Sequence, residues 1–139
     1  MSGINKDRFW TAVEVTAENV SVYYAKLELN NGHTDVNKTN SPDIQMVPGV
    51  TIEPGQTGYE WFGNRNLGRV EATLDFKIPN AESPYGFSLY IRSASAKNGN
   101  KAQITKQNLG EEYYIVGPEV DNLNGMGAMG NVKIQVYKK

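Results

Sequence analysis

Residues 69–78 read RVEATLDFKI, and this stretch decides the fold. Its apolar residues, among them Val70, Leu74 and Phe76, occupy every second position and alternate with charged or hydroxyl-bearing residues. A period of two is that of a β-strand with one buried face and one solvated face. The segment is therefore predicted to be an antiparallel strand.

Four further segments carry the same period: residues 9–17, 21–29, 87–92 and 132–137. Glycine, proline and asparagine turns separate them, and no segment has a sustained helical period. The sequence therefore predicts an all-β fold, a two-sheet antiparallel β-sandwich in a single domain over residues 1–139. The predicted core comprises Val13, Val15, Leu27, Leu29, Val70, Leu74, Phe76, Leu89, Ile91, Ile134 and Val136.

Charge and cysteine content exclude several classes of function. The chain of 139 residues has a net charge of −1, which gives no general attraction to phosphate backbones, so no nucleic-acid partner is expected. It has no cysteine, which excludes disulfides, thiolate metal sites and a cysteine nucleophile. We find no apolar signal segment and no stretch approaching the ~18 apolar residues of a membrane span. The expectation is a soluble protein without a signal peptide, cytoplasmic in its producer and acting extracellularly on target membranes.

The sequence offers no catalytic group. His33 is the only histidine and lies in a turn, without a second histidine or cysteine as a partner. Residues 125–130 match the pattern G-x-G-x-x-G, but a strand follows them where a dinucleotide site needs a helix. They are interpreted as a glycine-rich bend before the last strand. We therefore expect no enzymatic activity, no cofactor and no metal.

Aromatic residues beside cations form the candidate site. Strand parity places Tyr24 with Lys26, and Tyr90 with Arg92, on the solvated face. A cation beside a ring suits a phosphate that carries an amine, because the cation pairs with the phosphate and the ring faces the ammonium. The alternative is that loops cover this face and the rings belong to the core. The predicted lipid-binding residues are Tyr24, Lys26, Trp61, Arg65, Tyr90 and Arg92, with Trp10 and Tyr85 as weaker members.

Several short motifs follow one another along the chain in a characteristic order. They are Trp10 opening the first strand, YAKL at 24–27 before a glycine turn, IEP at 52–54, TLDF at 73–76 after GNR, and GAMG at 127–130 before the last strand. In order, spacing and total length they resemble the aegerolysins, small acidic β-sandwich proteins of fungi and bacteria. The resemblance covers most of the chain, from Trp10 to Lys139.

The resemblance implies binding to sphingolipid-containing membranes. Several aegerolysins recruit a larger partner of the membrane-attack-complex/perforin type and form a pore with it, and some bacterial pairs are insecticidal. The departures concern the lipid site: the fungal Trp-Asp-Cys-Pro-Trp segment is LYIRS at 89–93 here, Phe62 stands near the position of a family cysteine, and Glu71 is out of register with a family acidic residue. The lipid specificity of the fungal members is therefore not carried over, and a divergent bacterial member is expected.

Three classes of function stay open at this point. The first is the lipid-binding, targeting component of a two-component pore-forming toxin. The second is a lectin-like carbohydrate-binding module that stacks aromatic rings on sugars, and the third is a structural protein without a ligand. Binding to protein-free liposomes with and without sphingolipid separates them.

Overall fold

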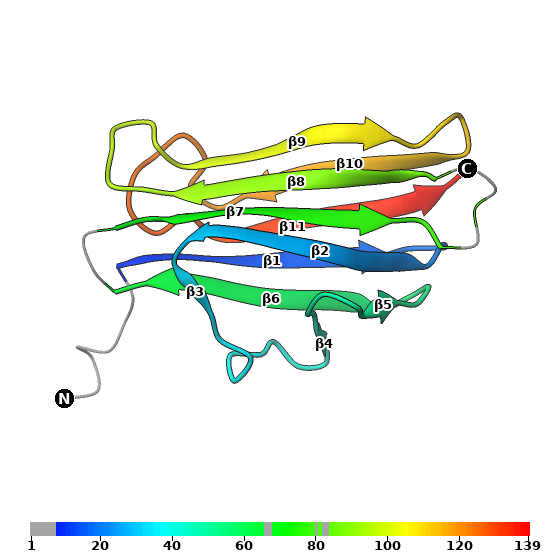
Figure 1. The fold of residues 1–139 in the computed structure, drawn as a ribbon, viewed down its shortest axis with the longest axis horizontal. Helices are drawn as coiled ribbons and strands as arrows, with labels where there is room; N and C mark the ends of the chain where they lie inside the picture. Colours follow the sequence, from blue (N-terminus) through cyan, green and yellow to red (C-terminus); the bar gives the residue numbers. More distant parts are fainter. Residues whose placement is uncertain (1–7, 66–67, 80, 82–83) are drawn as a thin grey trace.

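Two β-sheets pack face to face in the computed structural model, which describes residues 8–65, 68–79, 81 and 84–139 (Figure 1). The prediction of an all-β, two-sheet sandwich rich in antiparallel pairs is confirmed. Over the described ranges every regular element is a strand, and no helix is long and apolar enough to cross a membrane.

Sheet A has six strands. In spatial order they are β10 (Tyr113–Val120), β11 (Gly130–Lys138), β1 (Phe9–Ala17), β6 (Thr57–Asn64) and β3 (His33–Thr34), with β4 (Ile44–Gln45) also paired to β6. The first and last long strands of the chain, β1 and β11, lie side by side and run parallel. Most other pairs are antiparallel, β4 with β6 being the second parallel one.

Sheet B has five strands and is antiparallel throughout. In spatial order they are β5 (Thr51–Ile52), β2 (Val22–Asn31), β7 (Val70–Lys77), β8 (Gly86–Ser93) and β9 (Lys101–Asn108). The decisive stretch of the sequence is thus the central strand, with a neighbour on each side.

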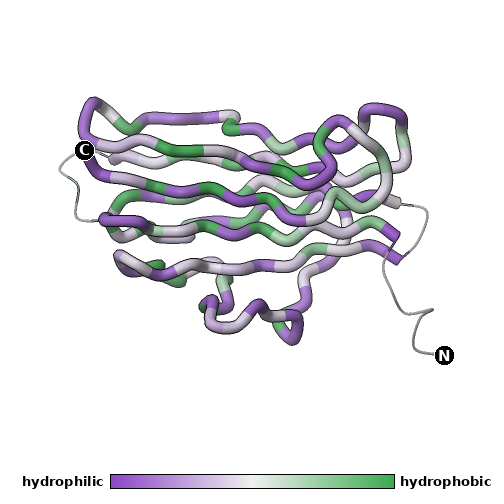
Figure 2. The backbone as a smooth tube through the Cα atoms, turned by 180° about the vertical axis from the view of Figure 1, so that it is seen from behind, coloured by the Kyte–Doolittle hydropathy of each residue, from purple (hydrophilic) through white to green (hydrophobic). Residues whose placement is uncertain are grey.

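The inward faces of the two sheets form one core. Figure 2 shows hydrophobic and hydrophilic residues alternating along the strands, as expected where one face of each strand is buried. Tyr24, Phe76 and Phe87 form an aromatic row across β2, β7 and β8, with successive ring centroids 5.0 Å apart. Stacked rings at this distance add to the free energy gained by burying their area.

A β-bulge in β2 corrects the predicted parity of that strand. Tyr24 pairs with Phe76 and Lys26 pairs with Asp75, so Ala25 is the extra residue. Tyr24, which is predicted to lie on the solvated face, is therefore fully buried, and its neighbour Tyr23 points outward. After the bulge the predicted parity holds, but Leu29, near the end of the strand, is 38% exposed and is not part of the core.

One hydrogen bond joins the two sheets through the core. The Tyr24 hydroxyl donates to Oε1 of Glu60 at 2.6 Å, and the Glu60 side chain is buried although it is a carboxylate. Burial raises the pKa of Glu60 from 4.5 to about 7, and burial beside Glu60 also raises the pKa of Tyr24. A buried ionisable group at this position makes folding depend on pH.

Stability should fall as the pH rises through neutrality. Folded Glu60 retains its proton up to about pH 7, whereas the unfolded chain releases it near pH 4.5, so the folded state binds more protons between these values. The free energy of unfolding is expected to lose about 3 kcal/mol from this group between pH 4 and pH 8. Chemical denaturation of the native chain and of Glu60→Gln across this range measures the effect. An identical pH dependence in both proteins would contradict the assignment.

Candidate functional site

The outer face of sheet B carries an excess of positive charge and is called the basic face below. It consists of the outward side chains of β2, β7, β8 and β9. Its cations are Lys26, Arg69, Lys77, Arg92, Lys101 and Lys106, and its acids are Glu28, Glu71 and Asp75. The chain as a whole has a net charge of only −1, so an excess of positive charge on this face means that the positive and negative residues lie on different parts of the surface.

Glu71 is the centre of a hydrogen-bonded cluster on the basic face. The Tyr90 hydroxyl donates to its Oε2 at 2.5 Å, and Arg69 approaches Oε1 through Nε at 3.0 Å and Nη2 at 2.9 Å. The bond from Tyr90, together with Arg69 and Arg92, lowers the pKa of Glu71. Burial and the bond to Glu71 raise the pKa of Tyr90. At neutral pH the cluster therefore contains a carboxylate, a neutral phenol and guanidinium groups.

Arg92 provides a donor that the fold does not use. It lies directly across from Glu71 on one side and from Lys101 on the other. Its Nε is buried, and within the described part of the chain this atom has no hydrogen-bond partner. An unsatisfied buried donor costs free energy, and such a group is often completed by a bound ion or water.

A hollow of about 320 Å³ lies on sheet B where β8 begins and β9 ends, at the end of these strands far from Arg92 and Lys101. Lys77 and Lys106 are among its lining residues, and Asp75 accepts a hydrogen bond of 2.6 Å from the hydroxyl of Ser88 beside it. The basic face thus has cations along its whole length.

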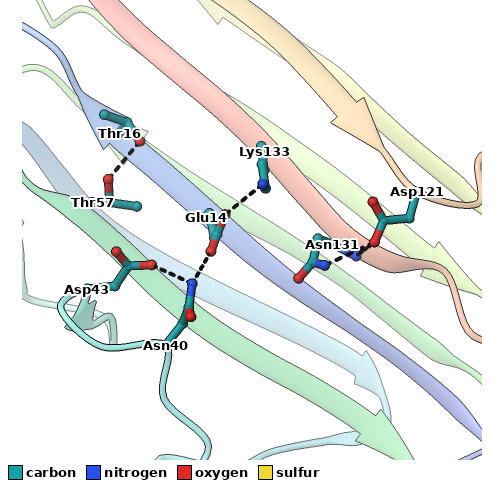
Figure 3. Close-up of polar contacts among 8 residues, drawn as sticks. All are labelled: Glu14, Thr16, Asn40, Asp43, Thr57, Asp121, Asn131 and Lys133. Carbon is teal, nitrogen blue, oxygen red and sulfur yellow. Dashed lines mark hydrogen bonds and ion pairs between the residues drawn. The ribbon is translucent and has the colours of Figure 1, made fainter.

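The outer face of sheet A has the opposite character and is called the acidic face. Figure 3 shows its polar contacts: Glu14 accepts a hydrogen bond from Asn40 at 2.7 Å and pairs with Lys133 at 3.8 Å. The acids on or beside this face are Glu14, Glu18, Asp43, Glu119 and Asp121, against the cations Lys38 and Lys133.

A smaller hollow of about 180 Å³ lies on the acidic face between β1, β10 and β11. Glu14, Lys133 and Gln135 are among its lining residues. Tyr114 and Tyr137 are the next outward-facing pair of β10 and β11 beyond Gln135, and their rings stack with centroids 4.9 Å apart. Polar side chains therefore lie next to an aromatic platform.

The structure divides the predicted site between these two faces. Lys26, Tyr90 and Arg92 share the basic face as predicted. Trp10 and Trp61 point to the outer side of sheet A, on the far side of the sandwich. The eight residues therefore do not form one patch, because β1 and β6 belong to the other sheet.

Trp61 is also covered by its neighbours. The Nζ of Lys38 lies 4.7 Å from the centroid of its ring, and the ring of His33 lies 5.8 Å away. Only 7% of Trp61 is exposed, whereas Trp10 is half-buried.

Three further predicted residues lie apart from the basic face. The predicted exposure of Tyr24 is wrong, because the bulge at Ala25 turns its ring into the core. Tyr85 is half-buried, and its ring packs edge-on against Tyr113 at 5.7 Å. Arg65 is exposed and follows directly after β6.

The predicted site leaves out seven charged members of the basic face: Glu28, Arg69, Glu71, Asp75, Lys77, Lys101 and Lys106. Arg69 and Glu71 were assigned to a solvent-facing pattern without a role, although their neighbours Tyr90 and Arg92 were selected. Lys101 and Lys106 lie on β9, which was not predicted as a strand. A signal existed in the alternation of Ala102 and Ile104 with polar residues, but it spans too few apolar positions to stand out.

The glycine-rich segment is a bend, as predicted. Residues 125–129 end the connection from β10 to β11, Gly130 is the first residue of β11, and Gly127 and Gly130 have positive φ angles of 84° and 81°. Among the described residues no group of three or more His, Cys, Asp and Glu side chains gathers in a way that could hold a metal.

Comparison with known proteins identifies the fold. No protein-family model and no curated protein matches this chain. Two solved structures are similar over nearly their whole length, each with a TM-score of 0.67 and 17% sequence identity. One is IP-1A from Alcaligenes faecalis, with 99% of this chain and 96% of that chain covered, and the other is RahU in complex with a Tris molecule, with 94% and 96% covered. Both are aegerolysin-type proteins, so this chain has an aegerolysin-type fold.

Two tyrosine substitutions should separate core from surface. Tyr24→Ala removes a fully buried ring and its bond to Glu60, so it should lower the free energy of unfolding by about 3–5 kcal/mol. Tyr90→Ala removes a half-buried ring on the basic face and should cost about 1 kcal/mol. Urea denaturation of both variants checks this order, and a larger loss for Tyr90→Ala would refute the placement.

Proposed function

We propose that this protein binds membrane lipid of the sphingolipid type through its basic face and acts by binding, not by catalytic turnover. The observation that carries the proposal is the buried, unpartnered Nε of Arg92 beside the Tyr90–Glu71 pair, on an aegerolysin-type fold. The cluster offers a donor for an anion next to groups that attract a cation.

The chemistry of the cluster matches a phosphate that carries an amine. Arg92, with Lys101 directly across from it, would bind the phosphate through charge-assisted hydrogen bonds. The ring of Tyr90 and the carboxylate of Glu71 would face the ammonium group. Because Glu71 is held in its charged form, this arrangement is available at neutral pH.

The wider face would supply attraction over a longer range. Where the membrane also holds anionic lipid, each cation near its surface contributes about 1 kcal/mol, and the effect declines within a Debye length. With one basic and one acidic face, the protein would approach a membrane with sheet B toward the lipid and sheet A toward the solution. The acidic face then stays available to a second protein.

The proposal extends to a two-component toxin. The chain would be the targeting component, and a larger protein of the membrane-attack-complex/perforin type would be recruited and form the pore. Insecticidal activity, as in some bacterial pairs of aegerolysin and perforin-like proteins, belongs to the same proposal.

Vesicle binding tests the lipid function. Cosedimentation with vesicles of phosphatidylcholine and cholesterol, with and without sphingomyelin, should show binding that needs the sphingolipid. Arg92→Gln and Lys26→Gln should each weaken binding about fivefold or more, because each removes a cation that faces the headgroup phosphates. Lys133→Gln, a matched loss of charge on the acidic face, should bind like the native chain. Equal losses in all three variants, or no binding by the native chain, would reject the basic face as the lipid surface.

A carbohydrate site is the second candidate, favoured by the acidic face. The hollow beside the Tyr114–Tyr137 stack pairs hydrogen-bonding groups with an aromatic surface, as sugar recognition requires. Binding to glycan arrays, abolished by Tyr137→Ala and unaffected by Arg92→Gln, would favour this function over the lipid function.

The protein alone should bind membranes without lysing them. Each described strand is hydrogen-bonded within one of the two packed sheets, so we expect the folded sandwich to stay at the membrane surface. Vesicles loaded with a quenched dye should therefore retain the dye at protein concentrations that saturate binding. Dye release by the purified chain would show that it forms pores without a partner.

A further inference from the structure

The loop between β10 and β11 is hydrogen-bonded to sheet B. It connects two strands of sheet A, yet its backbone bonds reach the turn between β8 and β9 of sheet B. The amide of Asn100 donates to the carbonyl of Gly125 at 3.0 Å, and the amide of Gly127 donates to the carbonyl of Ala94 at 2.7 Å. Figure 1 shows the two loops together at one end of the sandwich.

Side chains fix the same loop from within. The amide group of Asn100 is fully buried, accepting from the amide of Ala94 at 2.9 Å and donating to the carbonyl of Asn122 at 3.2 Å. The Ser93 hydroxyl donates to the carbonyl of Gly127 at 2.5 Å. A loop held at so many points has a preorganised conformation, so the direction of its side chains is set before any ligand binds.

Two large apolar side chains nevertheless point away from this fixed loop. Leu123 is 45% exposed and Met126 is 62% exposed, and among the large hydrophobic residues of the described chain that are exposed, no other two share one loop. Water is an unfavourable environment for them, and the loop is too well bonded for their exposure to reflect a lack of structure.

Cations lie on the sheet B segments to which this loop is hydrogen-bonded. Met126 lies between Gly125 and Gly127, which bond to Asn100 and Ala94. Lys101 follows Asn100 directly, and Arg92 precedes Ala94 by two residues, so both cations of the proposed headgroup site lie at this end of the basic face. Lys97 is exposed in the same turn. The acid of the loop, Asp121, already accepts two hydrogen bonds from Asn131.

We propose that Leu123 and Met126 are a membrane anchor that enters the lipid layer while Arg92, Lys97 and Lys101 contact the phosphates above it. The inference rests on the proposed lipid function and names the end of the molecule that enters the bilayer. A lipid surface fits better than a protein groove, because apolar side chains on a loop that is bonded to a cation-bearing turn match an apolar layer beneath a layer of phosphates. A methionine side chain adapts to such a fluid layer because it is flexible and unbranched.

The test uses vesicles of phosphatidylcholine, cholesterol and sphingomyelin and three serine variants. Leu123→Ser and Met126→Ser should each weaken binding about tenfold, because each removes an apolar side chain that leaves water on binding. Val36→Ser is the matched control, since Val36 is 54% exposed but follows β3 on the other sheet, and it should bind like the native chain. All three residues are exposed, so the urea midpoints should stay within error of the native value.

Salt and a gain-of-binding variant sharpen the result. Raising the ionic strength should weaken the native chain and the two anchor variants by the same factor, because the lost contacts are apolar and not screened. Met126→Trp should bind more tightly than the native chain, since tryptophan is favoured at the membrane interface.

The outcomes distinguish this inference from the function on which it rests. If Arg92→Gln weakens binding but Leu123→Ser, Met126→Ser and Met126→Trp leave it unchanged, the anchor is wrong and the lipid function stands. If Val36→Ser weakens binding as much as the anchor variants, the anchor is also wrong. If the native chain binds no vesicle, both proposals fall.

Discussion

The β-bulge at Ala25 is the constraint on which both the core and the basic face depend. It turns Tyr24 inward, where the phenol stacks on Phe76 and donates to Glu60 of the opposite sheet. The same bulge keeps Lys26 on the outer side, so one strand supplies a central core residue and a cation of the binding surface. A hydroxyl in the core needs a partner, and a buried carboxylate needs a donor. Each group therefore satisfies the other across the sandwich.

Folding places the positive and negative residues of a nearly neutral chain on opposite faces of the sandwich. Strand alternation directs cations to the outer side of sheet B and carboxylates to the outer side of sheet A, and the apolar core keeps the two sets apart. The glycine-rich loop then closes one end of the sandwich and places Leu123 and Met126 at the end of sheet B that carries Arg92 and Lys101. In the proposed function these features act together, with the cations drawing the protein to the membrane surface and the apolar tip holding it there.

The sequence was sufficient for strands whose two faces differ clearly. Residues 9–17 were predicted as a strand and form β1 with the same bounds, and the alternation at 69–78 places β7 correctly. β6 was missed because a glycine, Gly58, and a buried glutamate, Glu60, occupy two of its inward positions. The prediction that Tyr24 is exposed is wrong because a bulge shifts which residues face the core, and the pattern of apolar and polar residues does not reveal a bulge. The separation of Trp61 from Tyr90 could not be predicted either, because it depends on which strands share a sheet.

Depth measurements on spin labels test most directly whether the basic face meets the membrane. The chain has no cysteine, so Gln103→Cys and Lys133→Cys each give a single labelling site, one on each outer face. On vesicles that contain sphingomyelin, the label at position 103 should lose its accessibility to a water-soluble relaxation agent, and the label at position 133 should keep it. Protection of position 133 with full accessibility at position 103 would contradict the account.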